Sequence, residues 1–260
     1  MSFSIEGKRM LVTGGARGIG GVSARYLASQ GAHVVTCDIR DEEGIQLAKE
    51  ATEAGPGWIT YRHMDVTKKD EVDAAVEFAV GELGGLDAVF NIAGKPAFSS
   101  AEDATEAFWD EQFDIHAKGT AFVCQAAFPH MKERGGSIVN VAAGGALKSE
   151  PVGLSAYSAS KGAVISYTRS IGLEWAPYRI RCNSVNPVVH TPGADEIDTK
   201  TTPELREAFH RQVHDKVPLG GKLGDVETDL APVFQFLASD ASKFITSQII
   251  AVDGGLLPLR

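Results

Sequence analysis

Cysteine and basic residues are scarce in this chain of 260 residues, and each shortage excludes a class of protein. The three cysteines, Cys37, Cys124 and Cys182, lie far apart and form no Cys-x-x-Cys pair. We therefore expect neither a disulfide framework nor a metal site, and interpret the thiols as reduced and buried. Lys and Arg number 25 against 34 Asp and Glu, so the formal charge is -9. This balance disfavours nucleic acid and anionic membrane surfaces as partners.

Long apolar runs are also missing. No segment approaches the roughly 18 apolar residues that a membrane-spanning helix needs, and the N-terminal segment reaches charged residues and a glycine after only a few positions. We expect a cytoplasmic protein. Hydrophobic residues make up 43% of the chain and charged residues 23%, which is ordinary globular usage and predicts one large domain over residues 1–260.

Short β-branched segments alternate with longer amphipathic segments along the chain. Strands are predicted at 10–13, 33–37, 58–64, 86–91, 137–141, 181–185 and 248–252, and helices at 22–30, 42–54, 71–83, 103–131, 155–177 and 225–238. The predicted fold class is therefore α/β, a single Rossmann-like doubly wound parallel sheet with helices on both faces. The polar segment 192–222 interrupts the alternation, and we interpret it as a substrate lid within the same domain.

Glycine is the compositional outlier, with 28 residues, and several glycines fall where the first predicted strand turns into the first helix. The turn reads Thr13-Gly14-Gly15-Ala16-Arg17-Gly18-Ile19-Gly20. Glycine lets the backbone approach a pyrophosphate closely, and N–H groups at the helix start can bind it. A turn of this kind can also be purely structural, so it needs support from its surroundings.

Asp38 supplies that support, because it ends the second predicted strand about 20 residues beyond the glycines. A carboxylate there accepts hydrogen bonds from an adenosine ribose and repels a 2′-phosphate, which favours NAD over NADP. Arg17 argues slightly the other way, since a guanidinium can pair with a 2′-phosphate, although a solvated turn residue is an equal alternative. Asp65 and Val66, after the third strand, are expected beside the adenine, and Asp65 is also a candidate helix N-cap.

Tyr157 and Lys161 are four residues apart at the start of a predicted helix, so the phenol and the ammonium share one face. An unperturbed tyrosine has a pKa near 10, and a neighbouring cation lowers it toward the range that a general base needs. The spacing is common by chance when taken alone. Because the same chain also contains the glycine turn, we interpret Tyr157 and Lys161 as a catalytic pair rather than as a chance spacing.

Over essentially its whole length the chain resembles the short-chain dehydrogenase/reductase family. The matching segments are Thr13 to Gly20, Asn91-Ile92-Ala93-Gly94, Tyr157 to Lys161, and Val252-Asp253-Gly254-Gly255. The resemblance implies hydride transfer between a nicotinamide and a secondary alcohol or ketone, with Tyr157 as general acid/base and Lys161 holding the nicotinamide ribose. It also implies cofactor contacts from Asn91, Ala93 and Gly94, and a homotetramer or homodimer.

Two departures from the family pattern concern catalytic positions. Ala143 stands where the family usually carries a serine that hydrogen-bonds the reacting oxygen, and losing one such donor typically costs about 10²–10³ in rate. Ser149 and Ser155 are weak substitutes, and Ser155 is more simply a helix N-cap. His116 stands where the family usually has an asparagine. His116 could keep a water relay to Lys161 or could titrate and donate a proton, while a packed helix histidine is an equal alternative.

A third departure is in the loop after the sixth predicted strand, which is one residue shorter than the family's and lacks its glycine. Pro187, Val189 and Thr191 are the expected cofactor contacts in this loop, with the Val189 backbone holding the carboxamide. His190, His210 and His214 lie in or beside the lid, and we interpret them as solvated residues rather than metal ligands.

Three functions are compatible with these residues. An NAD-dependent alcohol dehydrogenase or carbonyl reductase is favoured by Tyr157, Lys161 and Asp38. An isomerase, lyase or cyclase that uses Tyr157 without net redox is suggested by the missing serine. A cofactor-binding regulatory protein is disfavoured, because such a protein has no physical need for a phenol and an ammonium on one helix face.

Overall fold

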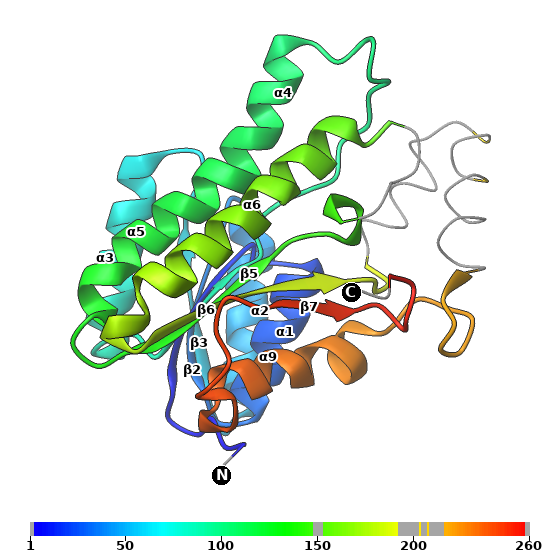
Figure 1. The fold of residues 1–260 in the computed structure, drawn as a ribbon. Helices are drawn as coiled ribbons and strands as arrows, with labels where there is room; N and C mark the ends of the chain where they lie inside the picture. The colour runs from blue at the N-terminus through cyan, green and yellow to red at the C-terminus, as the bar shows by residue number, and fades with distance from the viewer. Residues whose placement is uncertain (1–2, 148–152, 192–202, 204–206, 208–215, 258–260) are drawn as a thin grey trace.

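The computed structural model describes residues 3–147, 153–191, 203, 207 and 216–257. A seven-stranded parallel sheet with the strand order β3-β2-β1-β4-β5-β6-β7 forms its centre (Figure 1). The strands are β1 Arg9–Thr13, β2 His33–Asp38, β3 Trp58–His63, β4 Ala88–Asn91, β5 Gly136–Val141, β6 Ile180–Pro187 and β7 Ile249–Val252. The predicted fold class, a doubly wound parallel sheet, is confirmed.

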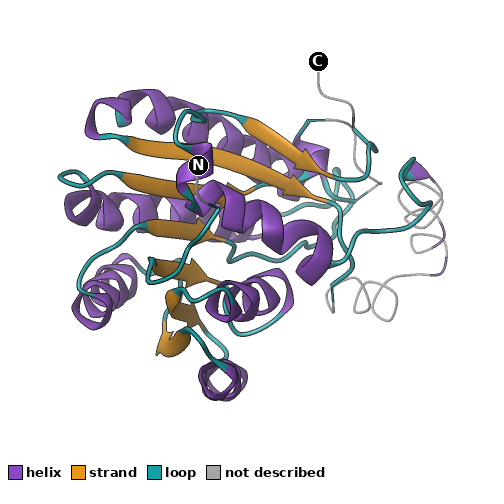
Figure 2. Cartoon of the chain, turned by 90° about the horizontal axis from the view of Figure 1, so that it is seen from below, coloured by secondary structure: helices purple, strands orange, loops and turns teal. Residues whose placement is uncertain are grey.

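Helices cover both faces of the sheet (Figures 1 and 2). One layer consists of α1 Gly18–Ser29, α2 Asp41–Ala54 and α9 Ala231–Ala238, and the other of α3 Lys69–Leu83, α5 Gly119–Met131 and α6 Ser155–Glu174. Alternate strand residues enter opposite layers: Leu11 belongs to the core cluster on the α3 side, whereas Met10 and Val12 belong to the cluster on the α1 side. Burial on both faces explains why the central residues of β1, β2, β4 and β5 are largely apolar.

The predicted helix over 103–131 is interrupted in the structure. It consists of α4 Glu106–Phe113, a π-helical turn Asp114–Lys118, and α5. The extra residue of a π-helical turn breaks the 3.6-residue repeat, and such turns occur frequently at functional sites. His116, which is fully buried, lies in this turn.

Two predicted N-caps were wrong. Ser155 is the first residue of α6 rather than its cap, which is Leu154. The cap position of α3 is Lys68, whereas Asp65 forms a local turn in which its Oδ1 accepts hydrogen bonds from the Thr67 N–H at 2.9 Å and the Thr67 hydroxyl at 2.8 Å. A short polar side chain that binds the backbone two residues ahead favours a turn over a cap.

The remaining predictions concern the cysteines, membrane helices, metal sites and the lid. The three cysteines are free and buried. Within the part of the chain that the structure describes, no helix is both long and apolar enough to cross a membrane, and no group of three or more His, Cys, Asp or Glu is placed to hold a metal ion. Most of the proposed lid lies outside the described residues, together with Ser149, His210 and His214.

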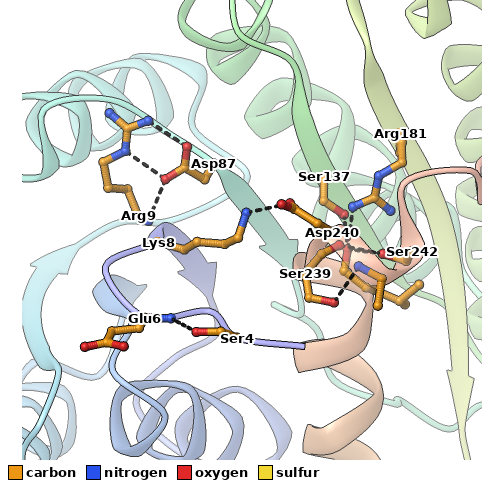
Figure 3. A network of polar contacts seen from close by, with 12 residues as sticks. Ser4, Glu6, Lys8, Arg9, Asp87, Ser137, Arg181, Ser239, Asp240 and Ser242 are labelled. Carbon is orange, nitrogen blue, oxygen red and sulfur yellow. Dashed lines mark hydrogen bonds and ion pairs between the residues drawn. The ribbon is translucent and has the colours of Figure 1, made fainter. Parts of the chain in front are cut away.

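An ion pair between Arg9 and Asp87 fastens β1 to the start of β4 at the edge of the sheet where the strands begin (Figure 3). The Asp87 carboxylate accepts from the Arg9 backbone N–H at 2.9 Å, from Nε at 2.8 Å and from Nη2 at 2.6 Å. Burial alone would raise the carboxyl pKa of Asp87, but the hydrogen bonds and the positive charge of Arg9 outweigh it and hold the pKa below the usual value.

Asp87→Asn is expected to lower the free energy of unfolding by about 2 kcal/mol, since hydrogen bonds to charged groups contribute roughly 1.5–3 kcal/mol. The lowered pKa means that this contribution is present above about pH 4, the ordinary carboxyl value, and is lost as the pH falls through the folded-state pKa. Urea titrations at neutral and acid pH measure both effects. Asp240→Asn is the matched control, because Asp240 makes one exposed ion pair with Lys8. An equal loss in both variants would contradict the assignment.

Candidate active site

A cavity of about 1050 Å³ lies at the carboxyl ends of the strands, where doubly wound sheets bind their ligands. The predicted site residues that line it are Gly14, Arg17, Gly18, Ile19, Gly20, Asp38, Asp65, Val66, Ala93, Gly94, Tyr157, Lys161, Pro187, Val189 and Thr191. Two other predicted site residues, Asn91 and His116, are buried behind the cavity wall. The structure therefore brings together residues from most of the length of the described chain.

The turn from β1 to α1 requires glycine at two positions. Gly18 has φ +57, in the left-handed region, and a Cβ there would meet no atom within 4 Å. At Gly20 a Cβ would lie 2.1 Å from the Gly14 carbonyl oxygen, so a side chain cannot be accommodated without moving the turn. The N-cap residue Arg17 makes no side-chain capping hydrogen bond, so the first N–H groups of α1 lack that partner. This geometry fits a bound pyrophosphate.

Asp38 at the end of β2 is held by two backbone donors. Its Oδ2 accepts from the Ala16 N–H and its Oδ1 from the Arg40 N–H, both at 3.1 Å. The guanidinium of Arg40 pairs with Glu43 at 3.0 Å, so the nearest base after Asp38 already has an anionic partner. A carboxylate fixed beside the glycine turn fits the ribose hydroxyls of a dinucleotide.

Asn91, a predicted cofactor contact, is not among the residues that line the cavity. Its Nδ2 donates to the Asn140 Oδ1 at 2.8 Å inside the sheet. Thr13 positions the loop after β4 instead, since its Oγ1 accepts hydrogen bonds from the N–H groups of Ile92 at 3.0 Å and Ala93 at 3.1 Å. This role of Thr13 was not predicted from the sequence, in which the one available signal is a hydroxyl at the end of a strand beside the glycine turn.

Tyr157 and Lys161 lie on one face of α6 and line the cavity together, as the spacing predicts. The Lys161 Nζ is 6.0 Å from the centroid of the Tyr157 ring and donates to the Val141 carbonyl at 2.8 Å. Burial lowers the pKa of Lys161 to about 8, because a charged ammonium is poorly solvated in the protein interior. A buried cation beside a phenol stabilises the phenolate, which is the form that acts as a general base.

His116 is buried and hydrogen-bonded on both sides of its ring. Its Nε2 accepts from the Lys95 backbone N–H at 3.2 Å, and its Nδ1 lies 2.9 Å from the Ser160 Oγ. Burial, together with the charge of Lys161, lowers the imidazole pKa to about 2. An imidazole with this pKa stays neutral at the pH of an assay.

Apolar residues make up much of the cavity lining. Ala142, Ala143, Gly144 and Gly145 after β5 contribute no polar side chain, and Phe98, Leu154, Val188, Leu223, Leu256 and Leu257 also line the cavity, as do the polar residues Lys95, Glu111, Asp114, Thr191 and Lys216. No serine among the described residues lines the cavity, and Ser155 is exposed on α6. Tyr157, Thr67 and Thr191 are the hydroxyl-bearing side chains among the described lining residues.

Comparisons with known proteins agree with this geometry. The sequence profile of the family described as Enoyl-(Acyl carrier protein) reductase matches residues 14–257. The chain is 37% identical to the 3-oxoacyl-[acyl-carrier-protein] reductase FabG of Thermotoga maritima over 97% of this chain and 99% of that protein. It is 35% identical to the trans-4-hydroxycyclohexanecarboxylate dehydrogenase of Sinomonas cyclohexanicum, over 98% of this chain and 95% of that protein. A short-chain type dehydrogenase/reductase from Mycobacterium marinum superposes with a TM-score of 0.89 at 30% identity, over 99% of this chain and 98% of that one.

The chain belongs to the short-chain dehydrogenase/reductase family. The family places it among oxidoreductases that act on hydroxyl or keto groups and use nicotinamide cofactors. The named relatives of this short-chain dehydrogenase/reductase act on different compounds, one on a 3-oxoacyl group and one on a hydroxylated cyclohexane ring. Family membership therefore defines the reaction class more closely than the substrate.

Proposed function

We propose that this protein is an NAD-dependent oxidoreductase that transfers a hydride between the nicotinamide and a secondary alcohol or ketone. The observation that carries the proposal is the buried Lys161 ammonium beside Tyr157, facing the cavity that also contains the glycine turn and Asp38. Burying the Lys161 ammonium costs free energy, so this lysine does not serve packing. A buried ammonium beside a phenol is useful in acid/base chemistry.

When bound, the nicotinamide of NAD supplies the carbon that accepts the hydride from the carbinol carbon. In the direction of oxidation, the Tyr157 phenolate takes the hydroxyl proton of the alcohol as the C–H electron pair leaves as hydride, and a ketone remains. In reduction, the Tyr157 hydroxyl returns that proton to the oxygen of the product. Lys161 stabilises the phenolate and, with the Val141 carbonyl, holds its own Nζ beside the cavity. The backbone of Val189 is assigned to the carboxamide, while Pro187 and Thr191 complete that wall.

NAD is the proposed cofactor because of Asp38. Its carboxylate is fixed beside the glycine turn by two backbone N–H groups, so it can accept from ribose hydroxyls but repels a 2′-phosphate. Gly14, Gly18, Ile19 and Gly20 are assigned to the pyrophosphate, and Asp65 and Val66 to the adenine. Arg17, which lines the cavity, favours NADP instead, because its guanidinium can pair with a 2′-phosphate.

The proposed substrate is a secondary alcohol or ketone on a hydrocarbon ring or chain. Leucine, valine, alanine and phenylalanine side chains line the cavity that contains Tyr157, and such side chains bind apolar groups by burial rather than by hydrogen bonds. The relative named for a hydroxylated cyclohexane ring supports the same class.

A spectrophotometric screen of secondary alcohols with NAD, and of ketones with NADH, tests the proposal, with Tyr157→Phe run in parallel. Turnover that requires Tyr157 supports it. The second candidate, a redox-neutral isomerase, lyase or cyclase, is favoured by the absence of a donor at Ala143. Conversion of a substrate that requires Tyr157 but leaves the nicotinamide unchanged would establish that candidate in place of the first.

Ala143→Ser is expected to raise kcat for simple alcohols about tenfold, because the new hydroxyl adds a donor at the reacting oxygen. Ala143 lines the cavity and is 8% exposed, so the added oxygen can reach it. Ala143→Cys is the matched control, since a thiol is similar in size but a weak donor. Equal rates for the two variants would show that the missing donor does not limit the reaction.

A homo-oligomer is also proposed, as the family resemblance implies. β7 forms an edge of the sheet, and all four of its residues are only partly buried. Leu173 and Tyr178, near the carboxyl end of α6, are 70% and 44% exposed. An exposed sheet edge and exposed large apolar side chains are typical of a surface that a partner covers.

A further inference from the structure

A chain of three hydrogen bonds runs behind the cavity wall and ends at the catalytic turn of α6. The Lys95 backbone N–H donates to the His116 Nε2 at 3.2 Å. The His116 Nδ1 lies 2.9 Å from the Ser160 Oγ, and the Ser160 hydroxyl donates to the Tyr157 carbonyl at 2.7 Å. His116 and Ser160 are both fully buried. The chain connects the loop after β4 to the residue proposed as the general acid/base.

The partners fix the protonation of the imidazole. A backbone N–H can only donate, so the His116 Nε2 must be the unprotonated nitrogen. The Ser160 hydroxyl already gives its proton to the Tyr157 carbonyl, so the Ser160 oxygen must accept from the His116 Nδ1–H. The neutral Nδ1–H form therefore satisfies these three hydrogen bonds. Backbone contacts with Gln112 and Lys95 raise the pKa of the ring, but burial and the charges of Lys161 and Lys95 outweigh them.

The ring also occupies the space between the loop and Lys161. A Cβ on Gly94 would lie 2.7 Å from the His116 Cδ2, 2.9 Å from its Nε2 and 3.5 Å from the Lys161 Nζ. The ring of His116 meets the Tyr157 ring edge-on, with centroids 5.2 Å apart. The imidazole is therefore packed against Gly94, Tyr157 and the neighbourhood of the Lys161 ammonium at once.

We propose that neutral His116, through Ser160, is a positioning residue that fixes the Gly94–Lys95 loop against the catalytic turn of α6, and that no proton passes through it. The proposal rests on the proposed dehydrogenase function. Ser160 enters the site as a second positioning residue. The π-helical turn Asp114–Lys118 is the part of the backbone that carries the ring, and it packs against α6.

The charges around His116 favour this form. Lys161 on α6 and Lys95 in the loop after β4 both disfavour a proton on the imidazole. The acid and base of its own turn, Asp114 and Lys118, pair with each other at 2.6 Å, and Tyr157 is the titratable group that faces the ring from α6. A proton relay would require the Nε2 to give up its hydrogen bond from the Lys95 N–H and to carry a proton near the Lys161 ammonium, which is electrostatically unfavourable. The Lys95 ammonium itself pairs with Glu111 at 2.9 Å.

Nitrogen NMR of the full chain with labelled histidine tests the protonation directly. His116 is assigned by the signals that disappear in His116→Gln. The expected result is a protonated Nδ1 and an unprotonated Nε2 that do not change between about pH 5 and pH 9, the range in which ordinary histidines titrate. Titration within that range, or a protonated Nε2, would overturn the proposal. This readout needs no turnover, so its failure is distinguishable from a failure of the proposed function.

Kinetics of matched variants test the positioning role. Ser160→Ala and His116→Gln are each expected to lower kcat about tenfold, with the KM of the substrate and the pH dependence of kcat unchanged. The double variant is expected to be no slower than the slower single variant, because both substitutions break one chain. Ser170→Ala removes an exposed serine on the same helix, whose hydroxyl bonds only the Ser166 carbonyl at 3.1 Å among the described contacts, and should leave kcat unchanged.

Two kinetic outcomes would contradict the positioning role. The first is a shift of the kcat pH profile by a full pH unit in either variant, which is the sign of a group that carries the proton. The second is multiplication of the two single effects in the double variant, which would show that His116 and Ser160 act independently. Neither outcome affects the separate requirement for Tyr157.

Discussion

Tyr157→Phe is expected to lower kcat about 10³-fold, the middle of the range for loss of a positioned general acid/base. The substitution removes one oxygen and leaves the ring, which lines the cavity and meets His116 edge-on. Cofactor affinity should therefore change by less than about twofold. Steady-state rates and a fluorescence titration with NADH separate the two quantities.

Tyr178→Phe is the matched control for this substitution, because Tyr178 is 44% exposed and lies outside the cavity. It should leave kcat unchanged. If Tyr157→Phe retained more than about a tenth of the wild-type rate, Tyr157 would not be the acid/base group. A loss of NADH affinity equal to the loss of rate would assign Tyr157 to binding instead of chemistry.

Asp38→Asn has the second largest expected effect, on the choice between NAD and NADP. The amide oxygen can still accept a hydrogen bond from the Ala16 N–H, which the carboxylate now accepts at 3.1 Å, while the hydrogen bond from the Arg40 N–H is lost together with the charge. Repulsion between a carboxylate and a 2′-phosphate in a partly exposed site is worth roughly 2 kcal/mol or more, or at least about 30-fold. The ratio of kcat/KM for NADP to that for NAD should rise by this factor.

Glu50→Gln removes the same charge from the exposed surface of α2, where Glu50 pairs with Arg25 at 3.5 Å. The ratio for this control should stay within about twofold of the wild type, since exposed charges far from the ligand are screened. An unchanged ratio in Asp38→Asn would refute the ribose assignment and would turn attention to Arg17 as the residue that sets the preference.

The elements that the sequence predicted well are those with a strong local pattern. The strands that became β1, β2 and β5 are apolar because both of their faces are buried, and a short apolar segment bounded by turn residues signals this directly. The helix over 103–131 was predicted as continuous because apolar periodicity does not report a single extra residue. The π-helical turn at Asp114–Lys118 depends on the tertiary contacts of His116 with Lys95 and Ser160.

In the site, too, local spacings were predictable from the sequence and tertiary contacts were not. Glycines at a turn, an acid about 20 residues later and a tyrosine four residues before a lysine are local spacings, and the structure gathers them around one cavity. The hydrogen bond from the Asn91 side chain to Asn140 could not be predicted, because the two residues are 49 positions apart in the sequence. Thr13 and Ser160 were missed because a buried hydroxyl reveals its role only through its partners in space.

A label-transfer experiment tests the central claim most directly. A secondary alcohol carrying deuterium on its carbinol carbon is incubated with the enzyme and NAD, and both products are analysed by mass spectrometry. Hydride transfer predicts one deuterium in the reduced nicotinamide for each ketone formed, with none released to water. Deuterium that remains on the carbon or exchanges with water while NAD stays oxidised would contradict the claim and would assign Tyr157 to a redox-neutral reaction.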